Sequence, residues 1–97
     1  LPHQLHLPTT LEYLTIRSFH EIEALPDSFR NLSSLESLNI GLCDKLMYLP
    51  SVDVMRSLGK LKVLGIVGCP QLNTRCERES GPEWCKISHI PHVFIND

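Results

Sequence analysis

The sequence predicts an α/β solenoid, a right-handed coil in which short parallel strands form a sheet on the concave face. The first observation is a pattern, Leu-x-x-Leu-x-Ile, that starts at Leu11, Leu35 and Leu61, 24 and 26 residues apart. The second is an apolar-x-x-Leu-Pro element that ends at Pro26 and Pro50. The third is the composition, 42% apolar and 21% charged, which is ordinary for a globular chain. Such short units cannot bury their apolar side chains alone, so stacked units with a shared core are expected.

Each unit is expected to hold one short strand around its Leu-x-Ile pair. In Leu38-x-Ile40 the two apolar side chains share one face, because side chains alternate along a strand, and the residue between them points outward. The other units repeat this spacing, so their strands can pair in parallel. The residues expected to be buried are Leu38, Ile40, Leu64 and Ile66, and those expected to be exposed are Glu36 and Asn39.

The segments that return from one strand to the next are predicted to be mostly irregular. One helical turn, capped by Asp or Ser, is predicted at each of two places, Pro26-Asp27-Ser28 and Ser51-Val52-Asp53. Cys43 and Cys69 follow their strands at matched positions. A small buried thiol at this place is expected to bond to the backbone of the turn and to be chemically inert.

The repeat pattern stops after Leu72, and the remaining residues predict a C-terminal cap. Ser80-x-x-Glu83 has the form of a capping box, which predicts a short helix over residues 82–88. We expect its apolar side, with Trp84, to cover the last layer of the core. Val93-x-Ile95 then repeats the strand pattern and predicts one last parallel strand. The predicted divisions are residues 1–10, the tail of a preceding repeat in a longer protein; residues 11–73, three repeats that start at about 11, 35 and 61; and residues 74–97, the cap.

Metal binding and catalysis find little support in the residues. Cys76, Cys85, His89 and His92 have the spacing C-x8-C-x3-H-x2-H, which lacks the tight cysteine pair of structural zinc sites. Cys85 and His89 lie one helical turn apart, but no third group would orient them for catalysis. The net charge of −2 does not favour nucleic acid. We therefore expect no enzyme activity, metal or cofactor, and keep a small zinc-stabilised domain as an alternative.

The repeat pattern and the C-terminal residues together resemble a known family. The spacing and the period are similar to those of leucine-rich repeats. The ending "GPEWCKISHIPHVFI" resembles the end of the repeat domain in plant nucleotide-binding leucine-rich-repeat disease-resistance proteins of the coiled-coil type. The matching elements are Glu83-Trp84, Lys86-Ile87 and His89-Ile90-Pro91, and the preceding "CPQLNTRCERESG" is also similar to that family.

The resemblance implies a cytoplasmic, protein-binding repeat domain of an intracellular plant immune receptor. Its partners would be a pathogen effector or a guarded host protein, and the receptor's own nucleotide-binding domain, which it would hold inactive. Neither nucleic acid nor a membrane span is expected. An extracellular leucine-rich-repeat module that binds a ligand is the other alternative, although the Gly-x-Ile-Pro element of that class is absent here.

The residues expected to contact a partner flank the buried pairs on the concave face. Exposed Tyr and Arg are common anchors of protein interfaces. In the first unit the candidates are Glu12, Tyr13, Thr15 and Arg17; in the second, Glu36, Ser37, Asn39 and Leu42; in the third, Lys62 and Val63, with Gly65 and Val67 at further outward positions.

Overall fold

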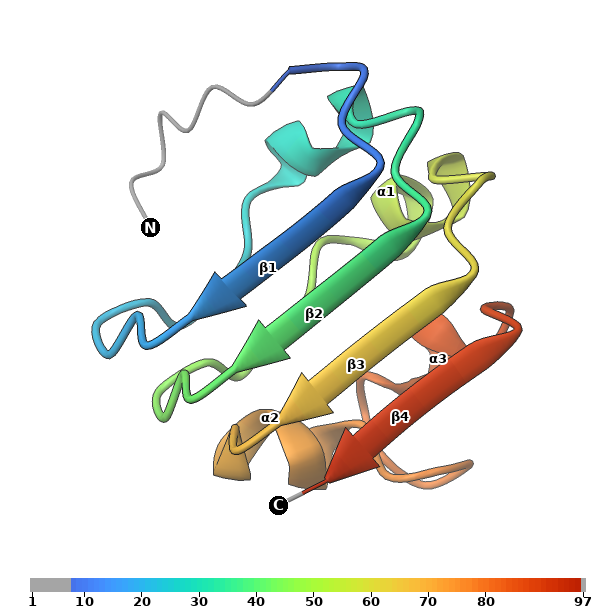
Figure 1. Cartoon of the computed structure of the whole chain (residues 1–97). Helices are drawn as coiled ribbons and strands as arrows, with labels where there is room; N and C mark the ends of the chain where they lie inside the picture. Colours follow the sequence, from blue (N-terminus) through green and yellow to red (C-terminus); the bar gives the residue numbers. More distant parts are fainter. Residues whose placement is uncertain (1–7, 97) are drawn as a thin grey trace.

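Four parallel strands pair side by side in the order in which they occur along the chain (Figure 1). The computed structural model describes residues 8–96. The strands are β1 (Tyr13–Arg17), β2 (Ser37–Gly41), β3 (Val63–Val67) and β4 (His92–Asn96). Each predicted Leu-x-Ile pair lies in one of the first three strands, and Val93-x-Ile95 lies in the fourth. Most of the predicted leading tail, residues 1–7, lies outside the described residues.

The parallel register places equivalent residues of the units next to one another. One row across the sheet consists of Leu14, Leu38, Leu64 and Val93, and the next of Ile16, Ile40, Ile66 and Ile95. In the two central strands these side chains are at most 2% exposed, as predicted. Leu14, Val93 and Ile95 are only partly buried, because β1 and β4 are edge strands that have a neighbour on one side.

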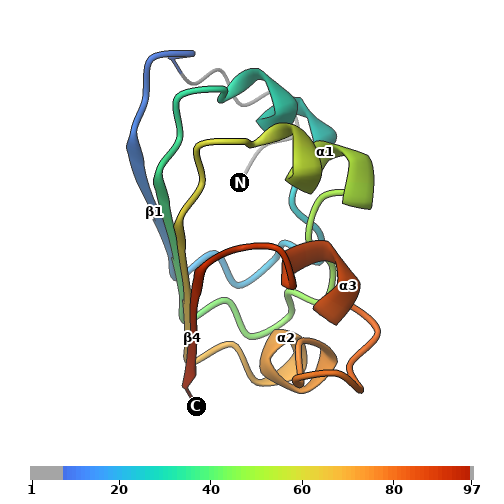
Figure 2. The same ribbon diagram turned by 90° about the vertical axis from the view of Figure 1, so that its right-hand side faces the viewer.

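Short helices cover one face of the sheet and leave the other face open (Figure 2). They are the 3-10 helix η1 (Asp27–Asn31), α1 (Val52–Ser57), α2 (Pro70–Arg75) and α3 (Trp84–Ile87). The helix α1 contacts both η1 and α3, so these three follow the order of the strands. Within residues 8–96 no helix has the length and apolar character needed to cross a membrane.

The predicted cap continues the repeat pattern into β4. Apolar residues recur with the same spacing at Phe29, Leu32 and Leu35, at Met55, Leu58 and Leu61, and at Trp84, Ile87 and Ile90. The backbone repeats as well: within each triplet the amide of the third residue donates to the carbonyl of the second, over 3.1, 3.1 and 3.0 Å. The predicted cap thus has the spacing of the earlier return segments and leads into one last parallel strand, as predicted.

Two predicted helix caps are wrong. Glu83 stands directly before α3 without a capping bond, and the helix begins at Trp84, two residues later than predicted. Asp27 does not cap η1, because its carboxylate accepts from the amide of Ser51 in the next unit, 3.2 Å away. Ser51 does cap α1 as predicted, since its hydroxyl accepts from the amide of Val54.

Glu36 is partly buried, whereas the sequence predicted an exposed residue. It precedes the central strand β2, so the segments that precede β1 and β3 lie on either side of it. Its amide donates to the Glu12 carbonyl over 2.8 Å, and its carbonyl accepts from the Lys62 amide over 2.9 Å. Asn39, in the middle of the strand, is exposed as predicted.

Between the first two units the return segments pair through their backbones. Ala24 and Tyr48 form a parallel bridge, and the amide of Leu25 donates to the Tyr48 carbonyl over 3.1 Å. These bonds satisfy backbone groups that would otherwise be left unpaired at the core.

Between the return segments that precede β3 and β4, two side chains bond to the backbone of Leu49. Glu83 Oε1 accepts from the Leu49 amide over 2.7 Å, and Lys86 Nζ donates to the Leu49 carbonyl over 3.0 Å. The two side chains also pair with each other at 2.9 Å and are 5% and 17% exposed. We call Glu83 and Lys86 the backbone clamp. The Glu83 carboxylate replaces the carbonyl, and the Lys86 ammonium replaces the amide, that a neighbouring backbone would offer to Leu49.

Replacing Leu38 by Ala tests the shared core. The side chain is fully buried in the central layer, so its truncation should lower the free energy of unfolding by about 2–5 kcal/mol. Urea denaturation followed by circular dichroism measures the loss. Asn39→Ala on the exposed side of the same strand is the control, and equal stability of the two variants would contradict the assigned register.

Replacing Glu83 by Ala tests the backbone clamp. The variant leaves Lys86 without its buried carboxylate and the Leu49 amide without an acceptor, which should cost about 3–5 kcal/mol. Glu83→Gln keeps an acceptor oxygen and should cost less. The exposed Glu77→Ala is the control, expected to change stability by no more than about 0.5 kcal/mol. A Glu83→Ala variant as stable as Glu77→Ala would refute the clamp.

Candidate functional site

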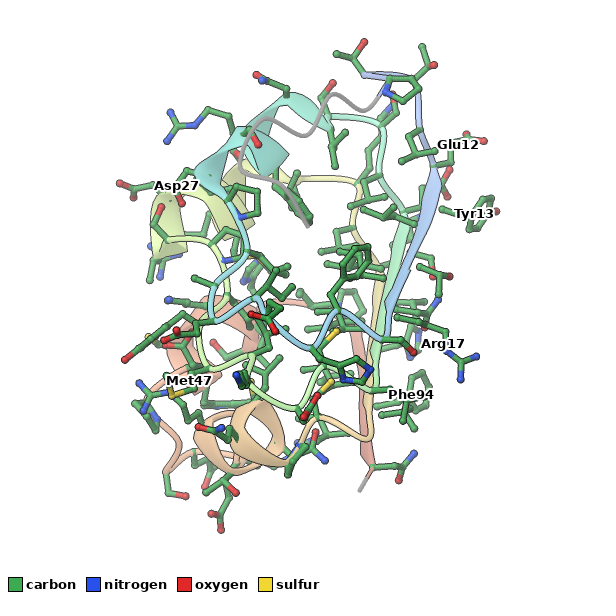
Figure 3. All side chains as sticks on the ribbon, turned by 90° about the vertical axis from the view of Figure 1, so that its left-hand side faces the viewer. Glu12, Tyr13, Arg17, Asp27, Met47 and Phe94 are labelled. Atoms are coloured by element: carbon green, nitrogen blue, oxygen red, sulfur yellow. The ribbon has the colours of Figure 1, made fainter. Side chains whose placement is uncertain are left out.

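The sheet face that lies opposite the helices carries the residues between the buried pairs, and we call it the outer face. Figure 3 shows Tyr13, Arg17 and Phe94 projecting from this face, with Asp27 and Met47 on the other side of the sheet. The strand register arranges its residues in three rows: Tyr13, Ser37, Val63 and His92; Thr15, Asn39, Gly65 and Phe94; and Arg17, Gly41, Val67 and Asn96.

Two glycines on neighbouring strands hollow the outer face. Gly41 on β2 lies between Arg17 and Val67, and Gly65 on β3 lies between Asn39 and Phe94. Because neither glycine has a side chain, a depression of about 360 Å³ remains. We call it the glycine hollow, and its lining residues are Thr15, Arg17, Asn39, Ile40, Gly41, Leu42, Gly65 and Val67.

Arg17 extends across the glycine hollow. A Cβ atom at Gly41 would lie 3.4 Å from Arg17 Cγ and 3.5 Å from its Nε, so the arginine side chain lies against Gly41. Among residues 8–96 the ion pairs join His20 to Asp44 and Lys86 to Glu83, and no carboxylate pairs with Arg17. The guanidinium is therefore held near the hollow with its donors available.

Large apolar side chains are exposed on the same side of the sheet as this arginine. The exposed fractions are 70% for Tyr13, 57% for Phe94, 49% for Val67 and 44% for Leu42. Val67 and Leu42 line the glycine hollow itself. Apolar residues gathered on one uncovered face are typical of a surface that binds another macromolecule.

The predicted contact residues separate into three groups. Thr15, Arg17, Asn39 and Leu42 line the glycine hollow together with Gly65 and Val67. Tyr13, Ser37 and Val63 form the adjoining row, in which Tyr13 is exposed and the other two are partly buried. Glu12, Glu36 and Lys62 precede the strands and join them through backbone bonds.

The sequence analysis missed Phe94. The sequence contained a signal for this residue. Side chains alternate along Val93-x-Ile95, which places the intervening Phe94 on the outer face, as in the earlier units. Phe94 pairs in register with Gly65 and is 57% exposed, so it adds an aromatic side chain beside the hollow.

A left-handed residue follows each of the first three strands. Ser18, Leu42 and Gly68 have φ angles of 61°, 53° and 70°. Their amides donate to carbonyls of the next strand over 3.0, 3.0 and 3.1 Å, which extends the pairing into the turns. This conformation costs a residue with a side chain about 1–2 kcal/mol, so Leu42 is both strained and exposed at the rim of the hollow.

The thiols that follow β2 and β3 bond to the turns as predicted. Cys43 Sγ donates to the Gly41 carbonyl over 3.3 Å, and Cys69 Sγ to the Val67 carbonyl over 3.7 Å. Burial raises the pKa of the Cys69 thiol, because a thiolate would lose its hydration there. These cysteines therefore have a structural role.

The residues of the zinc hypothesis do not converge. Cys76 is buried, and burial raises the pKa of its thiol to about 12, whereas Cys85 is exposed. His89 Nε2 lies 3.3 Å from the Met55 carbonyl. Within residues 8–96 no group of three or more His, Cys, Asp or Glu side chains is placed to hold a metal ion.

A comparison with known proteins finds a partial relative. Over 33 residues the chain is 48% identical to a Solanum bulbocastanum protein that bears the name disease resistance protein RGA4. The aligned part covers 34% of this chain and 3% of that protein. No known protein-family pattern matches the chain, and no solved structure matches it. The chain is thus related, over this stretch, to a plant disease resistance protein.

Replacing Gly68 by Ala tests the left-handed turn at the edge of the hollow. At its φ of 70°, a side chain is strained, and the new Cβ would lie 2.8 Å from Leu42 Cδ2. We expect a loss of about 1–2 kcal/mol in the free energy of unfolding, measured by urea denaturation.

Gly59→Ala is the matched control for this change. No atom lies within 4 Å of its added Cβ, and its φ is not in the left-handed region. This variant should be unchanged or more stable by about 0.4–1 kcal/mol, because alanine restricts the unfolded chain. A Gly68→Ala variant as stable as Gly59→Ala would contradict the strained turn.

Proposed function

We propose that this chain is the C-terminal leucine-rich-repeat segment of an intracellular plant immune receptor and that its outer face binds protein. The receptor would be of the nucleotide-binding, coiled-coil type. This segment would contribute to recognition of a pathogen effector or guarded host protein, and to the contact that keeps the nucleotide-binding domain inactive. It would have no enzyme activity and need no cofactor of its own.

The observation that carries the proposal is the outer face. It combines exposed Tyr13 and Phe94 with Arg17, and aromatic and arginine side chains are the commonest strong anchors of protein interfaces. The face belongs to a sheet with a buried core behind it, so the backbone that carries these side chains would not have to be ordered on binding. The 33-residue similarity to a disease resistance protein supports the receptor class.

The coil proposed from the sequence agrees with the repeated geometry. Strands, left-handed turns and return segments recur at matched positions of successive units. Units that contact only their neighbours are the defining property of repeat architectures. We therefore retain the leucine-rich-repeat solenoid, with the outer face as its concave side, as the proposed fold class.

An intracellular location is part of the proposal and is supported by the thiols. All four cysteines are free in the structure, and three of them are buried. Free thiols are usual in a reducing compartment, whereas an extracellular repeat module of this size commonly uses disulfides. Labelling of the native chain from plant tissue with a thiol reagent before and after reduction would separate the two classes.

Charge reversal at Arg17 on the outer face and at Lys62, which directly precedes β3, tests the proposed function. Arg17→Glu and Lys62→Glu should abolish effector recognition or release autoinhibition in the full-length receptor. The loss of a charge contact at an interface can reduce the binding free energy by about 2–5 kcal/mol. Both side chains are exposed, so stability should change by no more than about 0.5 kcal/mol. The measurement is cell death in leaf tissue, with and without the matching effector.

Arg30→Glu and Arg56→Glu are the controls, because these exposed residues lie in η1 and α1 on the opposite side. They should signal like the unmodified receptor. If the outer-face variants signal normally while the helix-side variants do not, the binding surface is on the helical side and the proposal is wrong.

A further inference from the structure

The glycine hollow indicates which kind of protein segment the outer face takes. Ligand pockets for small molecules usually enclose about 300–1,000 Å³. At about 360 Å³ and open to solvent, the hollow has room for one or two side chains of a partner rather than for an enclosed cofactor. Its floor is the backbone at Gly41 and Gly65, against which the side chains of Arg17 and Asn39 lie, so a partner would contact these two side chains at the floor.

The charge of the hollow favours an acidic group. Among the lining residues, all of which lie within residues 8–96, Arg17 is the one that carries a charge. Its stem lies against Gly41, and no carboxylate of residues 8–96 pairs with it. A guanidinium without a carboxylate partner is suited to bidentate bonds with a carboxylate of another protein. The chain as a whole carries a net charge of −2, which argues against a nucleic acid as the source of the negative group.

The other wall of the hollow is apolar. Leu42 and Val67 line it and are 44% and 49% exposed, so each has apolar surface left to bury. Leu42 keeps this exposed position in a left-handed conformation, with its Cδ2 atom beside Gly68. Ser18 and Gly68 share this conformation at the equivalent turns, so the turn geometry of the repeat is what holds the Leu42 side chain at the rim of the hollow.

We propose that the glycine hollow binds an extended segment of a partner protein that presents a carboxylate to Arg17 and, next to it, an apolar side chain to Leu42 and Val67. The Asn39 side chain, whose Oδ1 lies 2.6 Å from the position of a Cβ at Gly65, covers Gly65 and would border the apolar side chain. This inference rests on the proposed function, since it specifies the chemistry of the partner on the same face.

Selection from an unbiased phage-displayed library of peptides of about a dozen residues tests this proposal on the 97-residue chain. Enriched peptides should contain Asp or Glu close to Leu, Ile, Met or Phe. Synthetic copies, measured by calorimetry and by NMR shift mapping, should perturb the Gly41 and Gly65 amides. Enrichment of basic peptides, shifts confined to the helical side, or no enrichment at all would overturn the proposal.

Two variants separate the charged and the apolar parts of the hollow. Arg17→Glu should weaken the selected peptides about tenfold or more, and a peptide with Lys in place of its acidic residue should then bind the variant better than the unmodified chain. Gly41→Val fills the floor and should also weaken binding about tenfold. In the smaller Gly41→Ala change the added Cβ would be no closer than 3.4 Å to its neighbours, so that variant is expected to fold.

Arg56→Glu on α1 is the control and should leave peptide affinity unchanged. Circular dichroism melting of each variant shows whether it is folded; if Gly41→Val is not, Gly41→Ala replaces it. Equal affinities for the unmodified chain, Arg17→Glu and the folded glycine variant would refute the hollow as the site. If Lys62→Glu still changes receptor signalling in that case, the outer face remains the binding surface and only the chemistry assigned to the hollow is wrong.

Discussion

The Leu-x-Ile pair of each unit is buried only because the neighbouring units bring their own pairs into the same two rows. Leu38 and Ile40 lie between matching residues of β1 and β3, and their burial is nearly complete. A shift by one residue would expose the pair and bury the side chains of the outer face. The register therefore fixes both the core and the arrangement of Arg17, Gly41 and Val67 on the opposite face, since these share one row.

The strands were predictable because two independent signals coincide in them. Alternation predicts which side chains share a face, and repetition predicts which strands are neighbours. The last return segment was harder to recognise. The helix α2, which begins at Pro70, and the turns after it separate Trp84 from the preceding units by more residues than the period allows. The clamp was beyond local reasoning, because Glu83 has the sequence of a capping residue and instead binds a backbone group 34 residues away.

The candidate site was only partly predictable for a related reason. Alternation alone assigns Thr15, Arg17 and Asn39 to the outer face, and the structure places all three around the glycine hollow. The hollow itself depends on Gly41 and Gly65 lying diagonally on adjacent strands, which requires the register as well as the face. The approach of Arg17 to Gly41 depends on the conformation of a long side chain, and the spacing of residues in the sequence does not specify that conformation.

The backbone clamp has a consequence for how this chain reaches its structure. Most bonds between units join residues one period apart, but Glu83 and Lys86 bind Leu49 across 34 and 37 residues, over α2 and the turns that follow it. Closing this longer loop costs only slightly more chain entropy than closing one period, well under the roughly 0.6 kcal/mol of a doubled loop. The clamp can form only when the middle unit and the C-terminal unit are both in place. Once the C-terminal unit is bound, it cannot open without breaking the buried pair, which joins the end of the chain to the middle in one cooperative unit rather than leaving an end that frays independently.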